Sequence, residues 1–232
     1  MKTIQIEDIS ILLERKLIRS IRLSVKPDGS VQLRIPFFVS EQVALDFVRS
    51  KWSWLLRTRE RVLSRAQRPP LQYTSGETHY LFGEPYTLQI QPVTSGTNSV
   101  ELADGVIIMH CRPTTTLAGR QALLQTWYRA QLRTVLSSMM EQWTARLCEP
   151  DTTWTIRRMR SEWGSCAARK RHILFNLELA RVPLSCIEYI VVHELTHLAV
   201  QNHGPAFKFL MTQRLPQWPQ LRKQLKDAYV LA

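Results

Sequence analysis

The chain has 232 residues, of which 44% are hydrophobic and 22% charged, and its formal net charge is +12. This length allows one large domain or two small lobes, and the composition is ordinary for a globular protein. No apolar run approaches the roughly 20 residues of a membrane-spanning helix, so we expect no membrane partner. The N-terminus lacks the apolar segment of a secretory signal and no cysteines form a C-x-x-C pair, which together predict a cytoplasmic protein.

The excess of positive charge favours an anionic partner such as nucleic acid, a membrane surface or an acidic protein. The alternative is a set of arginines on solvated faces, because net charge alone speaks to solubility and non-specific binding. Basic residues gather on one face of a predicted helix and in a later loop, namely at Arg49, Lys51, Arg57, Arg59, Arg61 and Arg65, and at Arg169, Lys170 and Arg171.

The N-terminal part reads as strands followed by a helix, without an internal repeat. Residues 21–25 and 31–35 flank Pro27-Asp28-Gly29, a turn signal in which proline fixes φ and glycine accepts a positive one. Ser40 can cap a helix that runs to about Ala66, and the prolines after Arg68 end it. Two further strand regions are predicted around residues 80–90 and 100–110.

The C-terminal part reads as a long helix, strands and shorter helices. Apolar residues three or four apart predict a helix over residues 117–147. Strands are expected at 153–160 and 172–179, joined by a loop with the Trp-Gly-Ser-Cys motif at residues 163–166, and helices near 205–213 and 218–229. We place the lobe boundary near residue 113, giving a β-rich lobe with one basic helix at residues 1–112 and a second lobe at 113–232.

The chemistry is carried by the motif His193-Glu194-Leu195-Thr196-His197. Ser185 and Glu188 fit a capping box, which predicts that a helix starts there. His193 and His197 are four residues apart and lie one above the other on a helix, where neutral imidazoles can share one zinc ion. Glu194 is displaced by about 100° around the axis, so it can reach a metal-bound water as a general base instead of binding the metal.

His203 is the expected third metal ligand, since a catalytic zinc site takes three protein ligands and leaves one position open. A continuous helix would carry His203 about 9 Å past His197, so the helix must end between them. Asn202 tolerates the left-handed conformation of a helix end, and Gly204-Pro205 prevents simple continuation. The alternative is that the motif histidines are hydrogen-bonded surface residues. For His79, His110, His172 and the thiol of Cys166 we predict a structural role and not metal binding.

Several motifs together carry a family resemblance: Trp-Gly-Ser-Cys at 163–166, Leu-Phe-Asn-Leu at 174–177, the segment 190–198, and the pair Asn202-His203 followed by Phe207. Residues 20–54 and 81–83 add to it. The sequence resembles the YgjP-like metal-dependent hydrolases, which belong with the zincin metallopeptidases and are related to the SprT and WLM groups. The resemblance implies an α+β fold with a zincin-like minimal metallopeptidase core behind an N-terminal β-rich lobe.

For the site, the resemblance implies the metal ligands His193, His197 and His203 and the base Glu194. It also implies that a helix packs behind the metal helix and that a small sheet presents an edge strand at the cleft. One departure is Glu162, because the family usually has arginine before Trp-Gly-Ser-Cys.

We therefore predict a zinc metallopeptidase acting on a peptide or protein substrate. Zinc would polarise the carbonyl and lower the pKa of its bound water, and Glu194 would move the proton to the leaving amine. Tyr189 is a candidate to stabilise the oxyanion. The alternative is a DNA-associated protease that acts on DNA–protein complexes through its basic surface. A purely structural zinc site is disfavoured, because it would need a fourth protein ligand and has no use for Glu194.

Overall fold

The computed structural model describes residues 2–26, 28–66 and 71–231, which form two compact units, residues 1–70 and 71–232. Each unit has its own hydrophobic core. The observed division therefore differs from the predicted boundary near residue 113. The physical reason is that the strands between residues 78 and 111 bury Leu88, Ile107 and Met109 in the same core as Leu124 and Leu132 of the long helix.

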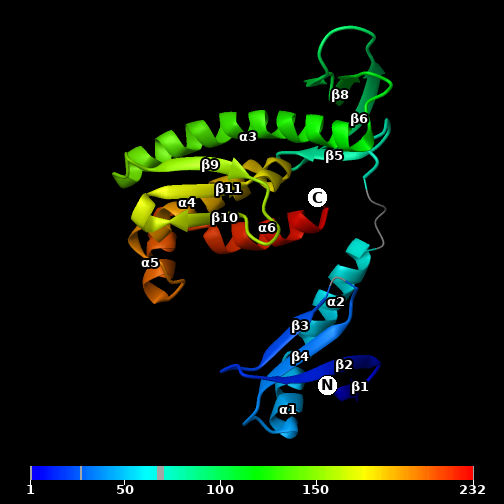
Figure 1. Cartoon of the computed structure of the whole chain (residues 1–232). Helices are drawn as coiled ribbons and strands as arrows, with labels where there is room; N and C mark the ends of the chain where they lie inside the picture. Colours follow the sequence, from blue (N-terminus) through cyan, green and yellow to red (C-terminus); the bar gives the residue numbers. More distant parts are fainter. Residues whose placement is uncertain (1, 27, 67–70, 232) are drawn as a thin grey trace. The chain divides into compact units, whose positions relative to one another are not determined.

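The N-terminal unit is a four-stranded sheet followed by two helices (Figure 1). The strand order is β1-β2-β4-β3, in which β2 and β4 are parallel and the outer pairs are antiparallel. Ser40 caps the first helix as predicted, but Lys51 ends it, so the single helix expected to Ala66 is two helices. The elements are β1 (Lys2–Ile6), β2 (Ile9–Lys16), β3 (Arg22–Val25), β4 (Val31–Pro36), α1 (Glu41–Ser50) and α2 (Trp52–Ala66).

A second sheet opens the C-terminal unit and repeats the topology of the first. Its order is β5-β6-β8-β7, again with a parallel central pair and antiparallel outer pairs. Gly29 and Gly105 both turn a hairpin with positive φ, and the same number of residues separates them from the helix caps Ser40 and Thr116. The strands are β5 (Thr78–Leu81), β6 (Glu84–Pro92), β7 (Ser99–Ala103) and β8 (Val106–Cys111). The structure thus contains a repeated topology that the sequence analysis did not find.

The rest of the C-terminal unit is a three-stranded sheet with helices (Figure 1). The long helix spans residues 117–147 as predicted, and it contacts the metal-motif helix α4. The Trp-Gly-Ser-Cys motif was expected in a loop, but its last three residues begin strand β10. Strand β10 is antiparallel to β11, and β11 is parallel to β9. The elements are α3 (Leu117–Leu147), β9 (Thr153–Arg157), β10 (Gly164–Ala167), η1 (Ala168–Lys170), β11 (His172–Asn176), η2 (Leu177–Arg181), α4 (Leu184–Ala199), α5 (Pro205–Arg214) and α6 (Trp218–Leu231).

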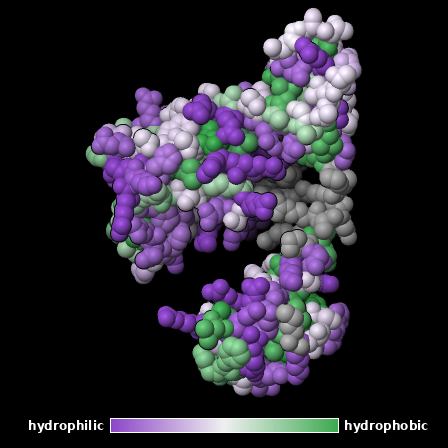
Figure 2. Space-filling model, in the orientation of Figure 1, coloured by the Kyte–Doolittle hydropathy of each residue, from purple (hydrophilic) through white to green (hydrophobic). Residues whose placement is uncertain are grey.

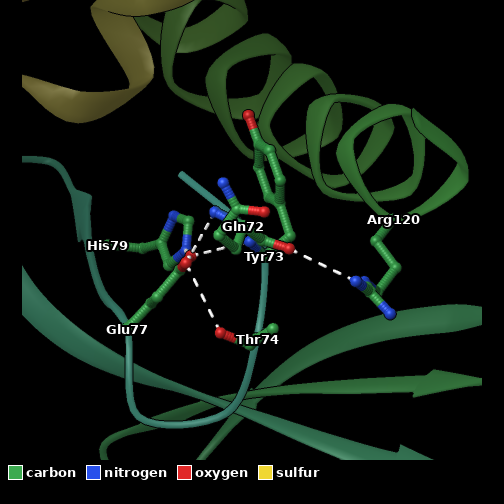
Figure 3. A network of polar contacts seen from close by, with 6 residues as sticks. All are labelled: Gln72, Tyr73, Thr74, Glu77, His79 and Arg120. Carbon is green, nitrogen blue, oxygen red and sulfur yellow. Dashed lines mark hydrogen bonds and ion pairs between the residues drawn. The ribbon is translucent and has the colours of Figure 1, made fainter. Parts of the chain in front are cut away.

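A network of polar contacts connects residues near the start of the C-terminal unit (Figure 3). The Glu77 carboxylate accepts hydrogen bonds from the backbone N–H groups of Gln72 and Tyr73 at 2.6 and 2.8 Å. It also lies 3.3 Å from Nε2 of His79, whose pKa is lowered by burial and by the charge of Arg181. His79 is buried and hydrogen-bonded, which fits the structural role predicted for it from the sequence.

The surface of both units is largely hydrophilic on the face drawn in Figure 2, with smaller hydrophobic areas among the polar side chains. Among the described residues, no helix combines the length and the apolar character needed to cross a membrane.

Candidate metal centre

The metal motif lies on α4, which begins differently from the prediction. The helix starts at Leu184 after Pro183, without a side-chain hydrogen bond at its cap. The predicted capping box is therefore not formed. Glu188 instead accepts a hydrogen bond of 3.1 Å from Nε1 of Trp143 on α3, because Trp143 is largely buried and its indole N–H needs an acceptor there.

The chain reverses between the second and third histidines, as the sequence required. The helix ends at Ala199, and Val200 is extended at φ −139° while its N–H still bonds to the carbonyl of Thr196. Asn202 is not among the described residues with positive φ, so an extended Val200 makes the break instead of a left-handed Asn202. Pro205 then occupies the first turn of α5, where its missing N–H costs nothing.

Three imidazoles meet at this reversal. Nε2 of His193 lies 3.2 Å from Nε2 of His197 and 3.0 Å from Nε2 of His203, and the candidate ligand atoms all lie within 4.8 Å of one another. Tetrahedral zinc with Zn–N bonds of about 2.0–2.1 Å would place two nitrogens roughly 3.3 Å apart. Two of the three nitrogen pairs therefore have close to the spacing of a tetrahedral metal site, and an all-imidazole donor set is one that suits zinc.

The protonation of the cluster also fits metal binding. Burial lowers the pKa of His193 to about 3, and the neighbouring His197 and His203 add to this effect. Burial likewise lowers the pKa of His197. Nδ1 of His197 lies 3.1 Å from the carbonyl of Val200. A proton on Nδ1 donates to that carbonyl and leaves the Nε2 lone pair for a metal.

Phe207 on α5 forms an apolar wall against all three imidazoles. Its ring centroid lies 4.9 Å from that of His193, 4.7 Å from that of His197 and 4.8 Å from that of His203. Phe207 is 3% exposed, so it shields one side of the cluster from water. The sequence analysis noted this aromatic residue only within the family pattern.

Glu194 is held against the edge strand β10. A Cβ atom placed on Gly164 would lie 2.6 Å from Oε1 of Glu194 and 2.8 Å from its Cδ, so only glycine leaves room for this carboxylate. Burial raises the pKa of Glu194 to about 8, and the negative charge of Glu162 adds to this rise. A cation bound beside it would act in the opposite direction and favour the carboxylate.

Asn176, at the end of β11, fixes the segment that leads into β10. Its side-chain NH₂ donates to the carbonyls of Met159 and Glu162 at 3.1 and 2.7 Å. Its side-chain oxygen accepts from the N–H groups of Met159 and Glu178, each at 3.2 Å. Asn176 is 5% exposed, and these bonds satisfy a buried amide while positioning Gly164. Sequence reasoning did not identify this role.

A cleft of about 610 Å³ opens beside the three histidines and Glu194. Tyr189, one turn before His193, lines it, and burial raises the pKa of its phenol, which keeps the hydroxyl protonated. Cys166 also lines the cleft, half-buried, with its pKa raised to about 11 mainly by burial. The sequence analysis did not foresee that Arg222 and Lys226 of α6 reach the same cleft.

Among the described residues, His110 and His172 are not in the group that could hold a metal. His110 contacts Glu101 at 2.9 Å, and His172 bonds to two threonine hydroxyls of β9. In the two basic groups, Arg59 donates to the carbonyl of Gly29 and Arg171 pairs with Glu149. The side chains of Arg61 and Arg65, also predicted on the basic helix, lie outside the described part of the chain.

A family model for the YgjP-like metallopeptidase domain matches residues 19–228. The chain belongs to this family, which confirms the resemblance carried by its motifs. No curated protein matches the chain.

The contact between Gly164 and Glu194 makes a direct prediction. Gly164→Ala should push the carboxylate aside, and because misplacing a reacting group by about 1 Å can cost about 10²-fold, peptide hydrolysis should fall by that order. Metal content should be unchanged, because the three atoms nearest to the added Cβ all belong to Glu194 and not to a histidine. The matched control is Gly204→Ala, whose Cβ would meet nothing within 4 Å. Equal hydrolysis by Gly164→Ala and the parent protein would contradict this packing argument.

Proposed function

We propose that this protein is a zinc-dependent peptidase in which His193, His197 and His203 hold the metal and Glu194 is the general base. The observation that carries the proposal is the convergence of the imidazole Nε2 atoms, at 3.0 and 3.2 Å, in the cleft that also contains Glu194. Membership of a metallopeptidase family supports a peptide substrate. A zincin-like core is inferred from the same membership.

The chemistry divides between the metal and the chain. A bound zinc ion would polarise the scissile carbonyl and lower the pKa of water towards 7. Glu194 would take a proton from the attacking water at its carboxylate and pass it to the nitrogen of the leaving amine. Tyr189, whose hydroxyl stays protonated, is the candidate to donate a hydrogen bond to the developing oxyanion.

A catalytic site fits the observed ligands better than a structural one. Structural zinc sites are closed by four protein ligands. Within the described residues, the group that could hold a metal consists of three histidines, and one of them, His203, is exposed. Water and a substrate would therefore have access to the metal.

The strand β10 offers a place for an extended peptide. It lies at the edge of its sheet and pairs with β11 on one side. Among the described strands, none pairs with its other side, and Gly164, Ser165 and Cys166 line the cleft. A substrate that adds as a further strand at this edge would be held by main-chain hydrogen bonds beside Glu194.

Replacement of the base tests this function. Glu194→Gln keeps the shape of the side chain but cannot accept the proton, so hydrolysis should fall by a factor on the order of 10² or more. The measurement is cleavage of unfolded protein substrates by the zinc-loaded proteins, with and without DNA. Zinc content of the variant should equal that of the parent protein.

Two results would count against the proposal. A zinc-loaded Glu194→Gln variant as active as the parent would remove Glu194 from the reaction. A parent protein that cleaves no substrate under any condition would contradict the peptidase function. Cleavage that requires DNA would favour a second candidate, a protease that acts on DNA–protein complexes.

This second candidate draws on the surface of the N-terminal unit. Leu17 is 95% exposed, Phe38 81% and Phe37 63%. These three residues, here called the apolar patch, follow the adjacent ends of the parallel strands β2 and β4. Arg19 is exposed close by in sequence, and residues 1–70 contain about twice as many basic as acidic residues. Exposed aromatics among cations are typical of surfaces that stack bases and contact phosphates.

Binding of a single-stranded oligonucleotide tests this candidate. Affinity should fall steeply as salt rises, because phosphate contacts release counterions. Phe38→Ala should weaken binding by about tenfold, the scale of one lost base–aromatic stack. Phe209→Ala is the matched control, since Phe209 is 64% exposed in the other unit. Absence of binding at low salt would leave the basic residues as a solvated surface.

A further inference from the structure

Helix α6 brings two cations to the cleft. Arg222 and Lys226 are one turn apart on the same face of the helix, and both line the cleft together with His193 and Glu194. Lys223, between them in sequence, points elsewhere and lines a separate hollow with Tyr80 and Pro183. The positive charge at the cleft is therefore a property of one helix face and not of the whole helix.

Neither cation is neutralised by the protein. Both side chains are exposed, and among the described residues no ion pair or hydrogen bond involves Arg222 or Lys226. The acidic residues that line the cleft are Glu162 and Glu194, and neither pairs with α6. Glu194 is packed against Gly164 on β10.

Arg222 lines the same cleft, of about 610 Å³, as the three imidazoles of the candidate metal centre. A group bound to Arg222 would thus lie beside the position where the scissile bond must approach the three imidazoles.

We propose that Arg222 and Lys226 anchor a carboxylate of the substrate next to the scissile bond, so that the cleft selects acidic peptides. The inference rests on the peptidase function proposed above and adds a substrate class to it. Arginine binds a carboxylate through two parallel hydrogen bonds, and a second cation one turn away strengthens that site. The carboxylate is either an Asp or Glu side chain or the C-terminus of the peptide.

Two other roles for these residues make different predictions. If Arg222 only stabilised the oxyanion, its loss would slow cleavage of all peptides alike, whatever their charge. If the two side chains were merely part of a solvated basic surface, replacing Lys223 would have the same effect as replacing Arg222. Selectivity between charged and neutral peptides separates all three roles.

The test is peptide binding by the zinc-loaded Glu194→Gln protein, measured by fluorescence anisotropy at physiological ionic strength. Each labelled peptide is used in an acidic form and in a form with Asn and Gln in place of Asp and Glu. A second pair compares a free C-terminus with an amidated one. We expect about tenfold tighter binding of whichever acidic form supplies the carboxylate, the scale of one hydrogen-bonded charge contact.

The variants assign that selectivity to α6. Arg222→Gln should remove the preference for acidic over neutral peptides, and Arg222→Glu should favour peptides with lysine at the same position. Lys223→Gln should keep the original preference. Equal binding of acidic and neutral peptides by the parent, loss of preference in Lys223→Gln as well, or no binding of any peptide would overturn the proposal.

The same peptides offered to the protein with Glu194 intact keep the two proposals apart. Selective binding without cleavage would retain the anchor and contradict the peptidase function. Cleavage of acidic and neutral peptides at equal rates, together with equal binding, would retain the peptidase function and remove the anchor.

Discussion

The candidate site depends on one chain reversal, in which α4 stops at Ala199 and returns His203 to the histidines already on the helix. Both backbone polar groups of the extended Val200 take part in this reversal. Its N–H completes the last turn of the helix, and its carbonyl lies 3.1 Å from Nδ1 of His197. The same residue that ends the helix therefore orients His197, a candidate ligand, and Phe207 in the next helix covers one side of the histidine cluster. Geometry and protonation are set by the same few contacts.

A second constraint places Glu194, the proposed base. Glu194 extends from α4 towards β10, where the missing side chain of Gly164 gives it space. The path of β10 is fixed by its ladder with β11 and by the four hydrogen bonds of Asn176. The proposed metal ligands thus come from α4 and the loop after it, while the position of the proposed base also depends on a neighbouring sheet. We therefore expect that a change in the sheet would alter the proposed hydrolysis without altering the proposed metal binding.

Much of this could be predicted from local patterns in the sequence. The spacing of the apolar residues predicted helix α3. The spacing of the histidines, together with Gly204-Pro205, predicted both α4 and its end. Features that depend on distant partners could not be predicted. Gly164 was placed in a loop because its strand is defined by pairing with β11, and Asn176 carries no local signal for its contacts. The predicted lobe boundary near residue 113 differs from the division at residues 70–71. The two four-stranded sheets have the same topology, but the first packs in the core of the N-terminal unit and the second in the core of the C-terminal unit. The cations of α6 reach the cleft only through tertiary packing.

X-ray absorption spectroscopy of the zinc-loaded protein tests the central claim most directly. Three imidazole nitrogens at about 2.0–2.1 Å are predicted in the parent protein, with an oxygen ligand completing the site. The His203→Ala variant should lose one of the three, whereas His172→Ala, which alters a histidine bonded to β9, should lose none. A sulfur ligand at about 2.3 Å, which would point to Cys166, or an unchanged spectrum in His203→Ala would contradict the three-histidine site.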